Sequence, residues 1–178
     1  MGKFEQQYTY GMVAESAIAK WLLNKGWCVQ PVYEIEIHSG KGPRLFTQDG
    51  EFVLPDMLTI KDSNIYWVEA KHKTHFTWYR QTNTWQTGVD LHHFKHYCRV
   101  AEITKIPVFL LFLHREHIPS QEDLINKCPA ECPVGLFGKR LDYLINEVDH
   151  ESLKHGSTGM VYWDYKTLSL IAPLEDLL

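Results

Sequence analysis

The chain has 178 residues, of which 44% are hydrophobic and 22% are charged, and its formal net charge is −4. These values predict one globular domain (residues 1–178), with a core over about residues 10–115 and a C-terminal extension over about residues 116–178. No apolar run approaches the roughly 18–20 residues that span a bilayer, and the N-terminus lacks a signal-peptide pattern, so we expect a cytoplasmic (intracellular) protein with no membrane partner. The negative net charge argues against a protein that coats nucleic acid without specificity.

A helix is expected over Tyr10 to Lys25, because apolar residues recur along one face and Gly26 follows the last of them. Glu15 borders that apolar face. Such an acid is either a first-turn residue favoured by the helix dipole or a carboxylate aimed at an interior site. A first strand is expected over Trp27 to Ile37, and a loop over residues 39–43.

Two strand-like segments, Phe52 to Ile60 and Ile65 to Lys73, flank a cluster of turn-forming residues and predict a hairpin. A symmetric two-residue turn would place Asp56 directly opposite Glu69, with Cβ atoms roughly 4.5–5.5 Å apart. Opposed carboxylates destabilise a strand pair unless a positive group lies between them, and a hard divalent cation with oxygen ligands is the usual group. Lys71 shares the face of Glu69, because side chains alternate along a strand. Taken alone, the pattern also fits a solvated strand end with an ordinary ion pair.

The segment His72 to Gly88 is dense in polar and aromatic residues. It is too polar for a buried strand and too aromatic for a plain linker. We expect either a surface flap that packs over the sheet or a loop that contacts nucleic acid. In the second case Trp78, Tyr79 and Trp85 stack on unpaired bases and Arg80 contacts a phosphate.

A helix is expected over Asp90 to Thr104, followed by a central strand buried on both faces over Pro107 to Leu113. Between residues 71 and 117 basic side chains outnumber acidic ones by seven to three. This excess fits a phosphodiester substrate, although a solvated helix face would have a similar composition. The residues expected to bind nucleic acid are Lys73, Trp78, Tyr79, Arg80, His93, Lys95 and Arg99.

The C-terminal third is less regular and carries no catalytic signature. We expect a loop or short helix over Glu122 to Cys132 and a helix over Leu136 to Val148. Residues 160–163 and 167–171 are expected to pair as a closing hairpin.

Four scattered cysteines favour a reduced, intracellular chain. Cys128 and Cys132 form at best half of a zinc site. His92 and His96 stand four residues apart and could bind a metal, but a polar helix face near phosphate is favoured. A zinc-binding protein that uses the cysteine pair and histidines is therefore a competing class.

The order of these elements resembles the PD-(D/E)xK nuclease superfamily over about the first two-thirds of the chain. Pro55-Asp56 resembles the PD element, and Glu69-Ala70-Lys71 resembles the ExK element. Glu15 is similar to the first-helix glutamate of Holliday junction resolvases and some exonucleases in that superfamily. The resemblance implies an α/β fold with an αβββαβ restriction-endonuclease-like core and a mixed central sheet flanked by helices, here with a C-terminal helix and hairpin.

Many members also carry a Gln or Tyr on the helix after the ExK strand. His93, His96 and Tyr97 occupy that region, and none of them maps onto the position without ambiguity.

The resemblance also implies a Mg²⁺-dependent nuclease that hydrolyses DNA phosphodiester bonds, with one or two Mg²⁺ or Mn²⁺ ions and no small-molecule cofactor. Asp56, Glu69, Glu15 and the backbone carbonyl of Ala70 would hold the metal. Lys71 would orient the water or stabilise the charge that develops on the phosphate.

DNA is the expected partner, and a homodimer is open because many such nucleases dimerise to cut two strands. Endonuclease and exonuclease activities, in repair or recombination, all fit the superfamily. The chain has no room for a separate target-recognition domain, so we expect recognition of DNA structure rather than of a long sequence. A non-cleaving nucleic-acid-binding module of the same fold is the main alternative.

Overall fold

The computed structural model describes residues 3–32 and 43–177, and describes the side chains of the first helix from residue 13 onwards. The second half of the expected first strand and the expected loop over 39–43, apart from Pro43, lie outside the described residues. No helix among the described residues is long and apolar enough to cross a membrane.

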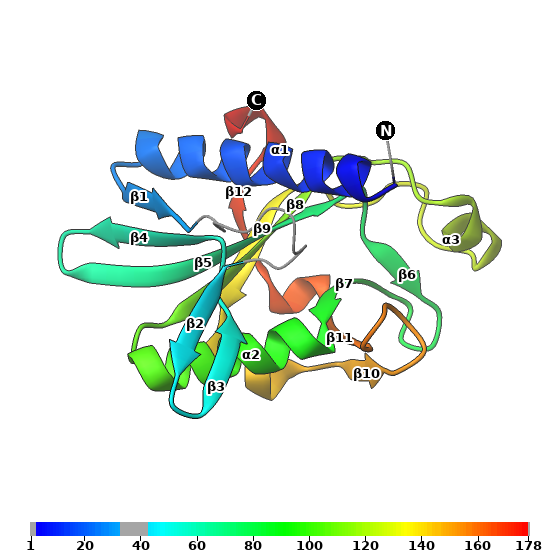
Figure 1. Ribbon diagram of the computed structural model, residues 1–178. Coiled ribbons are helices and arrows are strands. Elements are labelled where there is room, and N and C mark those ends of the chain that lie inside the picture. Colours follow the sequence, from blue (N-terminus) through cyan, green and yellow to red (C-terminus); the bar gives the residue numbers. More distant parts are fainter. Residues whose placement is uncertain (1–2, 33–42, 178) are drawn as a thin grey trace.

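A six-stranded sheet with the order β1-β4-β5-β8-β9-β12 forms the centre of the molecule (Figure 1). Its strands are β1 (Cys28–Pro31), β4 (Met57–Lys61), β5 (Asn64–Lys73), β8 (Val108–His114), β9 (Gly135–Arg140) and β12 (Ser169–Ala172). Strands β5 and β8 run parallel, and every other neighbouring pair is antiparallel. The sheet is therefore mixed, as the sequence predicted.

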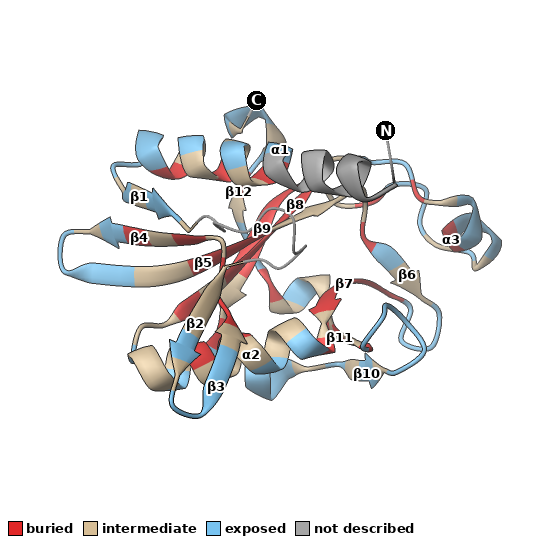
Figure 2. Ribbon diagram, in the orientation of Figure 1, coloured by how far each residue is buried: buried red, intermediate tan, exposed pale blue. Residues whose placement is uncertain are grey.

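Helix α1 (Lys3–Asn24) covers one face of this sheet and α2 (Leu91–Thr104) lies on the other. On the α1 face, Ala14 and Ile18 pack with Val68 and Ala70 of β5. On the α2 face, Tyr97 packs in a second core that includes the alternate residues of β8. Both faces of the central strands are consequently buried, and Figure 2 shows this burial along β8, β9 and the middle of β5.

Helix α1 begins earlier than predicted but ends where the sequence indicated. Gly26 has a φ of 82°, and the Trp27 N–H donates to the Leu22 carbonyl at 3.0 Å. A left-handed glycine after the last turn is a common way to end a helix, since glycine meets no Cβ penalty there.

The β4–β5 hairpin has the predicted register. Met57 lies opposite Val68 and Lys61 lies opposite Asn64. The turn is formed by Asp62 and Ser63, and Asp62 has a φ of 53°. The hairpin therefore brings the end of the Pro-Asp segment beside the Glu-Ala-Lys segment.

The expected strand over Phe52 to Ile60 is broken in the structure. Its first part belongs to β3 (Gly50–Val53), which pairs with β2 (Arg44–Thr47) in a separate two-stranded sheet. The Leu54 N–H still donates to the Pro43 carbonyl at 2.8 Å, and the pairing stops at Pro55 because proline has no N–H to donate. The chain then enters the central sheet at Met57.

The polar segment after the hairpin was wrongly expected to contain no buried strand. It forms β6 (Thr77–Tyr79) and β7 (Thr84–Asp90), in a second sheet with the order β10-β11-β7-β6. Strand β7 is buried from Thr84 to Val89. Its polar side chains can be buried because some find internal partners: the Gln86 side chain donates to Asp149 Oδ2 at 2.7 Å.

The helix expected over Leu136 to Val148 was also wrong. Strand β9 occupies the first part, and only α4 (Leu141–Leu144) and the 3₁₀ turn Ile145–Glu147 are helical. A Cβ on Gly138 would lie 2.5 Å from Leu111 Cδ2, so glycine permits the close approach of β9 to β8.

The closing hairpin was a third incorrect expectation. Strand β11 (Met160–Asp164) pairs with β7 and with β10 (His150–Ser152), whereas β12 joins the central sheet. The 3₁₀ turn Tyr165–Thr167 carries the chain from one sheet to the other. The remaining short helices are α3 (Gln121–Ile125) and the 3₁₀ turn Leu174–Asp176.

His114 ends β8 inside the core, and its environment predicts a pH dependence of stability. Its ring stacks on Phe76 with centroids 3.5 Å apart. Burial, and then the positive charge of Lys73, lower the pKa of His114 to about 3. This pKa is below the unfolded value of about 6.5, so the stability gained from a neutral ring is present above about pH 6.5 and is lost as the pH falls towards 3.

We expect His114→Phe to reduce this loss of unfolding free energy at acidic pH. In the wild type the loss amounts to about 1.4 kcal/mol per pH unit at its steepest. The measurement is the free energy of unfolding by urea at a series of pH values between about 4 and 7. His117→Phe, at an exposed position, is the control and should keep the wild-type slope. An unchanged slope in His114→Phe would contradict the assignment.

Candidate active site

Asp56 and Glu69 meet at the point where the β4–β5 pairing ends. Asp56 directly precedes β4, and its Oδ2 accepts a hydrogen bond of 2.7 Å from the Ala70 N–H. The bond satisfies a buried backbone donor and fixes the Asp56 carboxylate beside the Glu69-Ala70-Lys71 segment. The structure thus brings together the two carboxylates that the sequence predicted to face one another.

Glu69 is 1% exposed, which is rare for a carboxylate. Its Oε1 forms an ion pair with Lys71 Nζ. Its Oε2 is buried and accepts no hydrogen bond of good geometry from the described residues, although Tyr97 interacts with the Glu69 carboxylate: burial, and then the charge of Glu69, raise the pKa of Tyr97. A buried carboxylate oxygen left in this state costs free energy, and it marks a position where a cation or a hydrogen-bond donor would be stabilised.

Glu15 approaches the same cluster from α1. Burial, and then the negative charge of Glu69, raise the pKa of Glu15, and the charge of Lys71 opposes them. Because α1 begins at Lys3, Glu15 is not a first-turn residue, and that explanation of its position was wrong. Glu15 is instead within electrostatic reach of the hairpin carboxylates.

The charges of the cluster are strongly coupled. Burial, and then the negative charge of Glu69, raise the pKa of Asp56 well above its ordinary range. Burial lowers the pKa of Lys71, but the charges of Glu69 and Asp56 outweigh it and raise that pKa above its ordinary value. Lys71 is therefore protonated at neutral pH, but its charge does not offset the burial and the charge of Glu69 that raise the pKa values of Asp56 and Glu15.

Asp90 is a member of the cluster that the sequence did not reveal. Its negative charge acts on Lys71, Lys73, His93 and Tyr97. An acid directly before a helix is ordinarily explained as an N-cap, yet the Asp90 side chain makes no capping hydrogen bond to α2. Asp90 is the last residue of β7, where it pairs with Met160 of β11, and that pairing is not readable from local sequence.

Two of the residues expected to bind nucleic acid lie next to this cluster. Lys73 follows Lys71 on the same face of β5, and burial and then the charge of Lys71 lower the pKa of Lys73 to about 8. Burial and then the charge of Lys71 also lower the pKa of His93. Both side chains are poised to gain from a nearby anion, which would offset the repulsion from Lys71.

The other expected nucleic-acid contacts are more dispersed. Arg80 and Lys95 are exposed. Arg99 is held by two carboxylates, 2.6 Å from Glu102 and 3.2 Å from Asp49. These three side chains do not share a site with the carboxylate cluster in the way Lys73 does.

The three aromatic residues of the expected flap also separate, and Trp85 is buried in the hydrophobic core. Tyr79 stacks on His150 with centroids 4.3 Å apart, and its hydroxyl donates to Gln81 Oε1 at 2.6 Å. Trp78 packs edge-to-face against Trp85 with centroids 5.1 Å apart. Trp78 therefore belongs to a different surface, which forms a pocket described below.

The structure does not favour the alternative of a zinc site built from cysteines and histidines. Cys132 is buried, its Sγ lies 3.8 Å from the Phe76 carbonyl, and burial raises its pKa to about 11. A zinc ligand must be a thiolate, so this environment disfavours metal binding. His96 Nδ1 already accepts a 2.8 Å hydrogen bond from the Val53 N–H, although the ring of His92 lies beside it.

The described residues contain no group of three or more His, Cys, Asp or Glu side chains already arranged around a metal position. The donor set nevertheless suits a hard divalent cation. Asp56 and Glu69 supply carboxylate oxygens, Glu15 approaches them, and the buried Glu69 Oε2 accepts no hydrogen bond of good geometry from the described residues. Mg²⁺ and Mn²⁺ bind such oxygen ligands and keep several waters, so they need few protein donors.

The order α1-β1-β4-β5-α2-β8 is an αβββαβ arrangement, with the β2–β3 and β6–β7 strand pairs inserted into it. The chain thus has the restriction-endonuclease-like α/β fold expected from its sequence. A solved structure that shares this fold is Hjc, a Holliday junction resolvase from the archaeal hyperthermophile Archaeoglobus fulgidus. The two superpose with a TM-score of 0.50 and 8% sequence identity, over 88% of this chain and 90% of that chain.

At this identity the likeness shows the fold alone. No protein-family model matches the chain, and no curated protein sequence matches it.

Proposed function

We propose that the protein is a metal-dependent deoxyribonuclease that hydrolyses phosphodiester bonds in structured DNA. The observation that carries the proposal is the meeting of Asp56, Glu69 and Lys71 on one face of the β4–β5 hairpin, where the buried Oε2 of Glu69 accepts no hydrogen bond of good geometry from the described residues. The fold shared with a Holliday junction resolvase supports a nuclease that acts on DNA structure.

Asp56, Glu69, Glu15 and the Ala70 carbonyl are the groups proposed to hold one or two Mg²⁺ or Mn²⁺ ions. A bound divalent ion supplies a nucleophilic water at neutral pH and neutralises charge on the phosphate. The carboxylates of this chain fix where that positive charge lies. The raised pKa values of Asp56 and Glu15 mean that these two carboxylates ionise fully only with added positive charge nearby.

Lys71 is proposed to act as a hydrogen-bond donor and a positive charge rather than as a base, because its raised pKa keeps it protonated at neutral pH. It can thus orient a water or stabilise the charge that develops on a phosphate oxygen. Lys73 and His93 extend the same positive side of the site and are proposed to contact flanking phosphates. Arg80, Tyr79, Lys95 and Arg99 are proposed as more distant contacts to the DNA.

Cleavage of defined DNA forms tests the proposal. The substrates are end-labelled linear duplex, closed circular duplex, single-stranded DNA and a four-way junction, each with Mg²⁺, with Mn²⁺ and with EDTA. We expect metal-dependent cleavage that is fastest on the branched substrate. Nicked or linearised circles would indicate an endonuclease, and an uncut circle with shortened linear DNA an exonuclease.

A non-cleaving module of the same fold predicts DNA binding with no product in any metal. Binding without cleavage across all four substrates would therefore overturn the proposal in favour of that alternative. Resolving a junction requires a cut in each of two strands, and a homodimer would supply one active site for each cut. The oligomeric state of the protein should therefore be measured under the conditions of this assay.

A further inference from the structure

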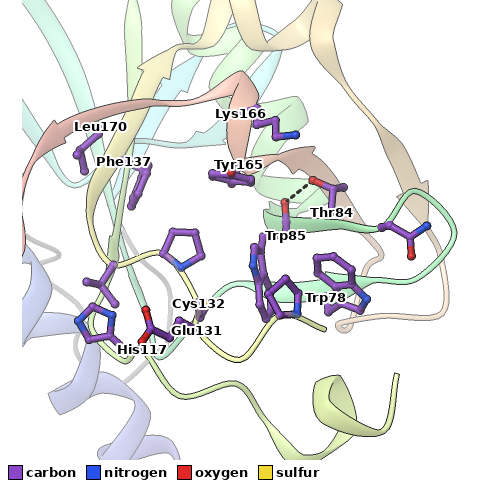
Figure 3. Close-up of a pocket in the computed structure, with 14 residues that line it drawn as sticks. Trp78, Thr84, Trp85, His117, Glu131, Cys132, Phe137, Tyr165, Lys166 and Leu170 are labelled. Atoms are coloured by element: carbon purple, nitrogen blue, oxygen red, sulfur yellow. Dashed lines mark hydrogen bonds between the residues drawn. The ribbon is translucent and has the colours of Figure 1, made fainter. Parts of the chain in front are cut away.

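A pocket of ≈ 650 Å³ lies between the β6–β7 strands, the loop before β9 and the 3₁₀ turn after β11 (Figure 3). Six of its lining residues carry the inference: Trp78, Asn83, Trp85, Glu131, Tyr165 and Lys166. Its volume is within the range of about 300–1,000 Å³ that is usual for small-molecule sites. Its lining includes neither Asp56 nor Glu69, so it is distinct from the candidate active site.

Several aromatic side chains line the pocket. Trp85 belongs to the buried core, and Trp78 leans edge-on against it while remaining partly exposed. The Trp78 backbone N–H donates to Asp123 Oδ1 at 2.8 Å, and Asp123 is itself 2% exposed. Trp78 is thus positioned before any ligand arrives, which lowers the entropic cost of binding.

The polar groups of the pocket are few and of specific kinds. Lys166 is exposed, and its Nζ lies 6.0 Å from the centroid of the Tyr165 ring. Asn83 is exposed at the tip of the β6–β7 turn, where its amide can both donate and accept. Trp78 is partly exposed, so part of its ring is open to a ligand in the pocket.

We propose that this pocket binds a single unpaired nucleotide of a DNA strand, a role that rests on the proposed function. Aromatic faces stack on any base, and an amide at the rim can meet a base edge. Lys166 supplies a positive charge that attracts the phosphate attached to the base. Glu131 on the opposite wall is negative and weakens the binding of that phosphate.

The pocket lies close enough to the candidate active site for one DNA strand to contact both. Trp78 is seven residues after Lys71, and seven residues of fully extended chain span at most about 25 Å. One strand leaving the scissile position could therefore reach the pocket within about seven base steps of 3.4 Å. A pocket for an unpaired nucleotide at that distance would select DNA with a flap, bulge or open junction over continuous duplex.

The test compares two probes in the absence of metal, using the full chain. One is a fluorescein-labelled duplex with a single bulged nucleotide, and the other is the same duplex fully paired. The quantity measured by fluorescence anisotropy is the ratio of the two dissociation constants. We expect the wild-type protein to prefer the bulged probe, and Trp78→Leu to lose about 5- to 150-fold of that preference.

Two exposed substitutions keep the test valid if Trp78→Leu perturbs folding. Lys166→Gln is expected to weaken binding of the bulged probe, and Glu131→Gln to strengthen it, because the two charges act on the same phosphate with opposite signs. Lys20→Gln, an exposed lysine on α1, is the matched control and should leave the ratio unchanged.

If Trp78→Leu and Lys166→Gln both leave the ratio of dissociation constants unchanged, the proposed nucleotide pocket is wrong. An equal loss of affinity for both probes would also contradict it. Failure of the pocket is separable from failure of the proposed function. If the protein cleaves DNA with metal but the variants leave the ratio of dissociation constants unchanged, only the proposal about the pocket is rejected. A pocket-dependent ratio in a protein that cuts no DNA would remove only the nuclease.

Discussion

Asp56→Asn is expected to abolish metal-dependent DNA cleavage while making the metal-free protein more stable. Asparagine keeps an oxygen that can accept the Ala70 N–H, so the hairpin geometry should survive. It removes one of the three carboxylates proposed to hold the metal. Replacing even an outer partner of a metal ligand costs about 10- to 100-fold in activity, so losing a ligand should cost more than about 100-fold.

The gain in stability follows from the direction in which the fold shifts the pKa of Asp56. Burial and Glu69 raise the pKa of Asp56 in the folded state, so the folded protein binds more protons than the unfolded chain. Stability of the metal-free wild type therefore falls as the pH rises above about 3.9 towards the folded-state pKa. Asp56→Asn lacks this loss, and its advantage should persist at neutral pH.

Thermal unfolding in EDTA and cleavage in Mg²⁺ measure the two effects. Asp62→Asn is a matched control, because Asp62 is exposed in the hairpin turn at a φ of 53° that asparagine also adopts readily. It should change neither quantity. Full cleavage by Asp56→Asn would remove the proposed function, and a lower melting temperature would contradict the charge argument.

Lys71→Ala is expected to abolish cleavage and, in contrast, to destabilise the fold. Lys71 is the ion-pair partner of Glu69 Oε1, and the other oxygen of the buried Glu69 accepts no hydrogen bond of good geometry from the described residues. Removing one member of a buried ion pair leaves an uncompensated charge and costs about 3–5 kcal/mol. Urea unfolding measures the loss.

Two further variants separate the cause. The double substitution Glu69→Gln with Lys71→Ala should recover most of the stability but none of the cleavage, because the buried charge is gone and the site with it. Lys73→Ala tests the same residue type two positions further along β5. Burial and Lys71 lower the pKa of Lys73 to about 8, so the fold disfavours that charge and its removal should be nearly neutral for stability. Equal stability of Lys71→Ala and Lys73→Ala would refute the role assigned to the Glu69 ion pair.

The parts of the fold that could be predicted are those set by local sequence. The turn at Asp62-Ser63 fixes the β4–β5 register, and this register aligns Asp56 with the Glu-Ala-Lys segment. The apolar run before His114 is a central strand, as expected, because continuous apolar sequence is buried on both faces. The basic helix also lies within one residue of its expected start. The catalytic roles of these residues stay predictions.

The parts that failed depend on distant partners. Leu136 packs in the α1-side core and Phe137 in the α2-side core, so β9 has consecutive apolar residues that also fit a helix. Strand β7 is polar and still buried, since the residues that satisfy it, such as Asp149, lie far along the chain. Asp90 is the last residue of that strand. A single sequence read locally holds no signal for these pairings.

The ion pair between Lys71 and Glu69 has a consequence for how this protein would respond to metal supply. The lysine serves as a built-in counter-ion, so the chain can complete its fold before any metal is loaded. An incoming divalent ion would have to compete with that ammonium for the same carboxylate, which sets a threshold of metal concentration for activity. Once displaced, the ammonium would become available to a phosphate. Folding and activation would then be separate events, with one side chain exchanging its role between them.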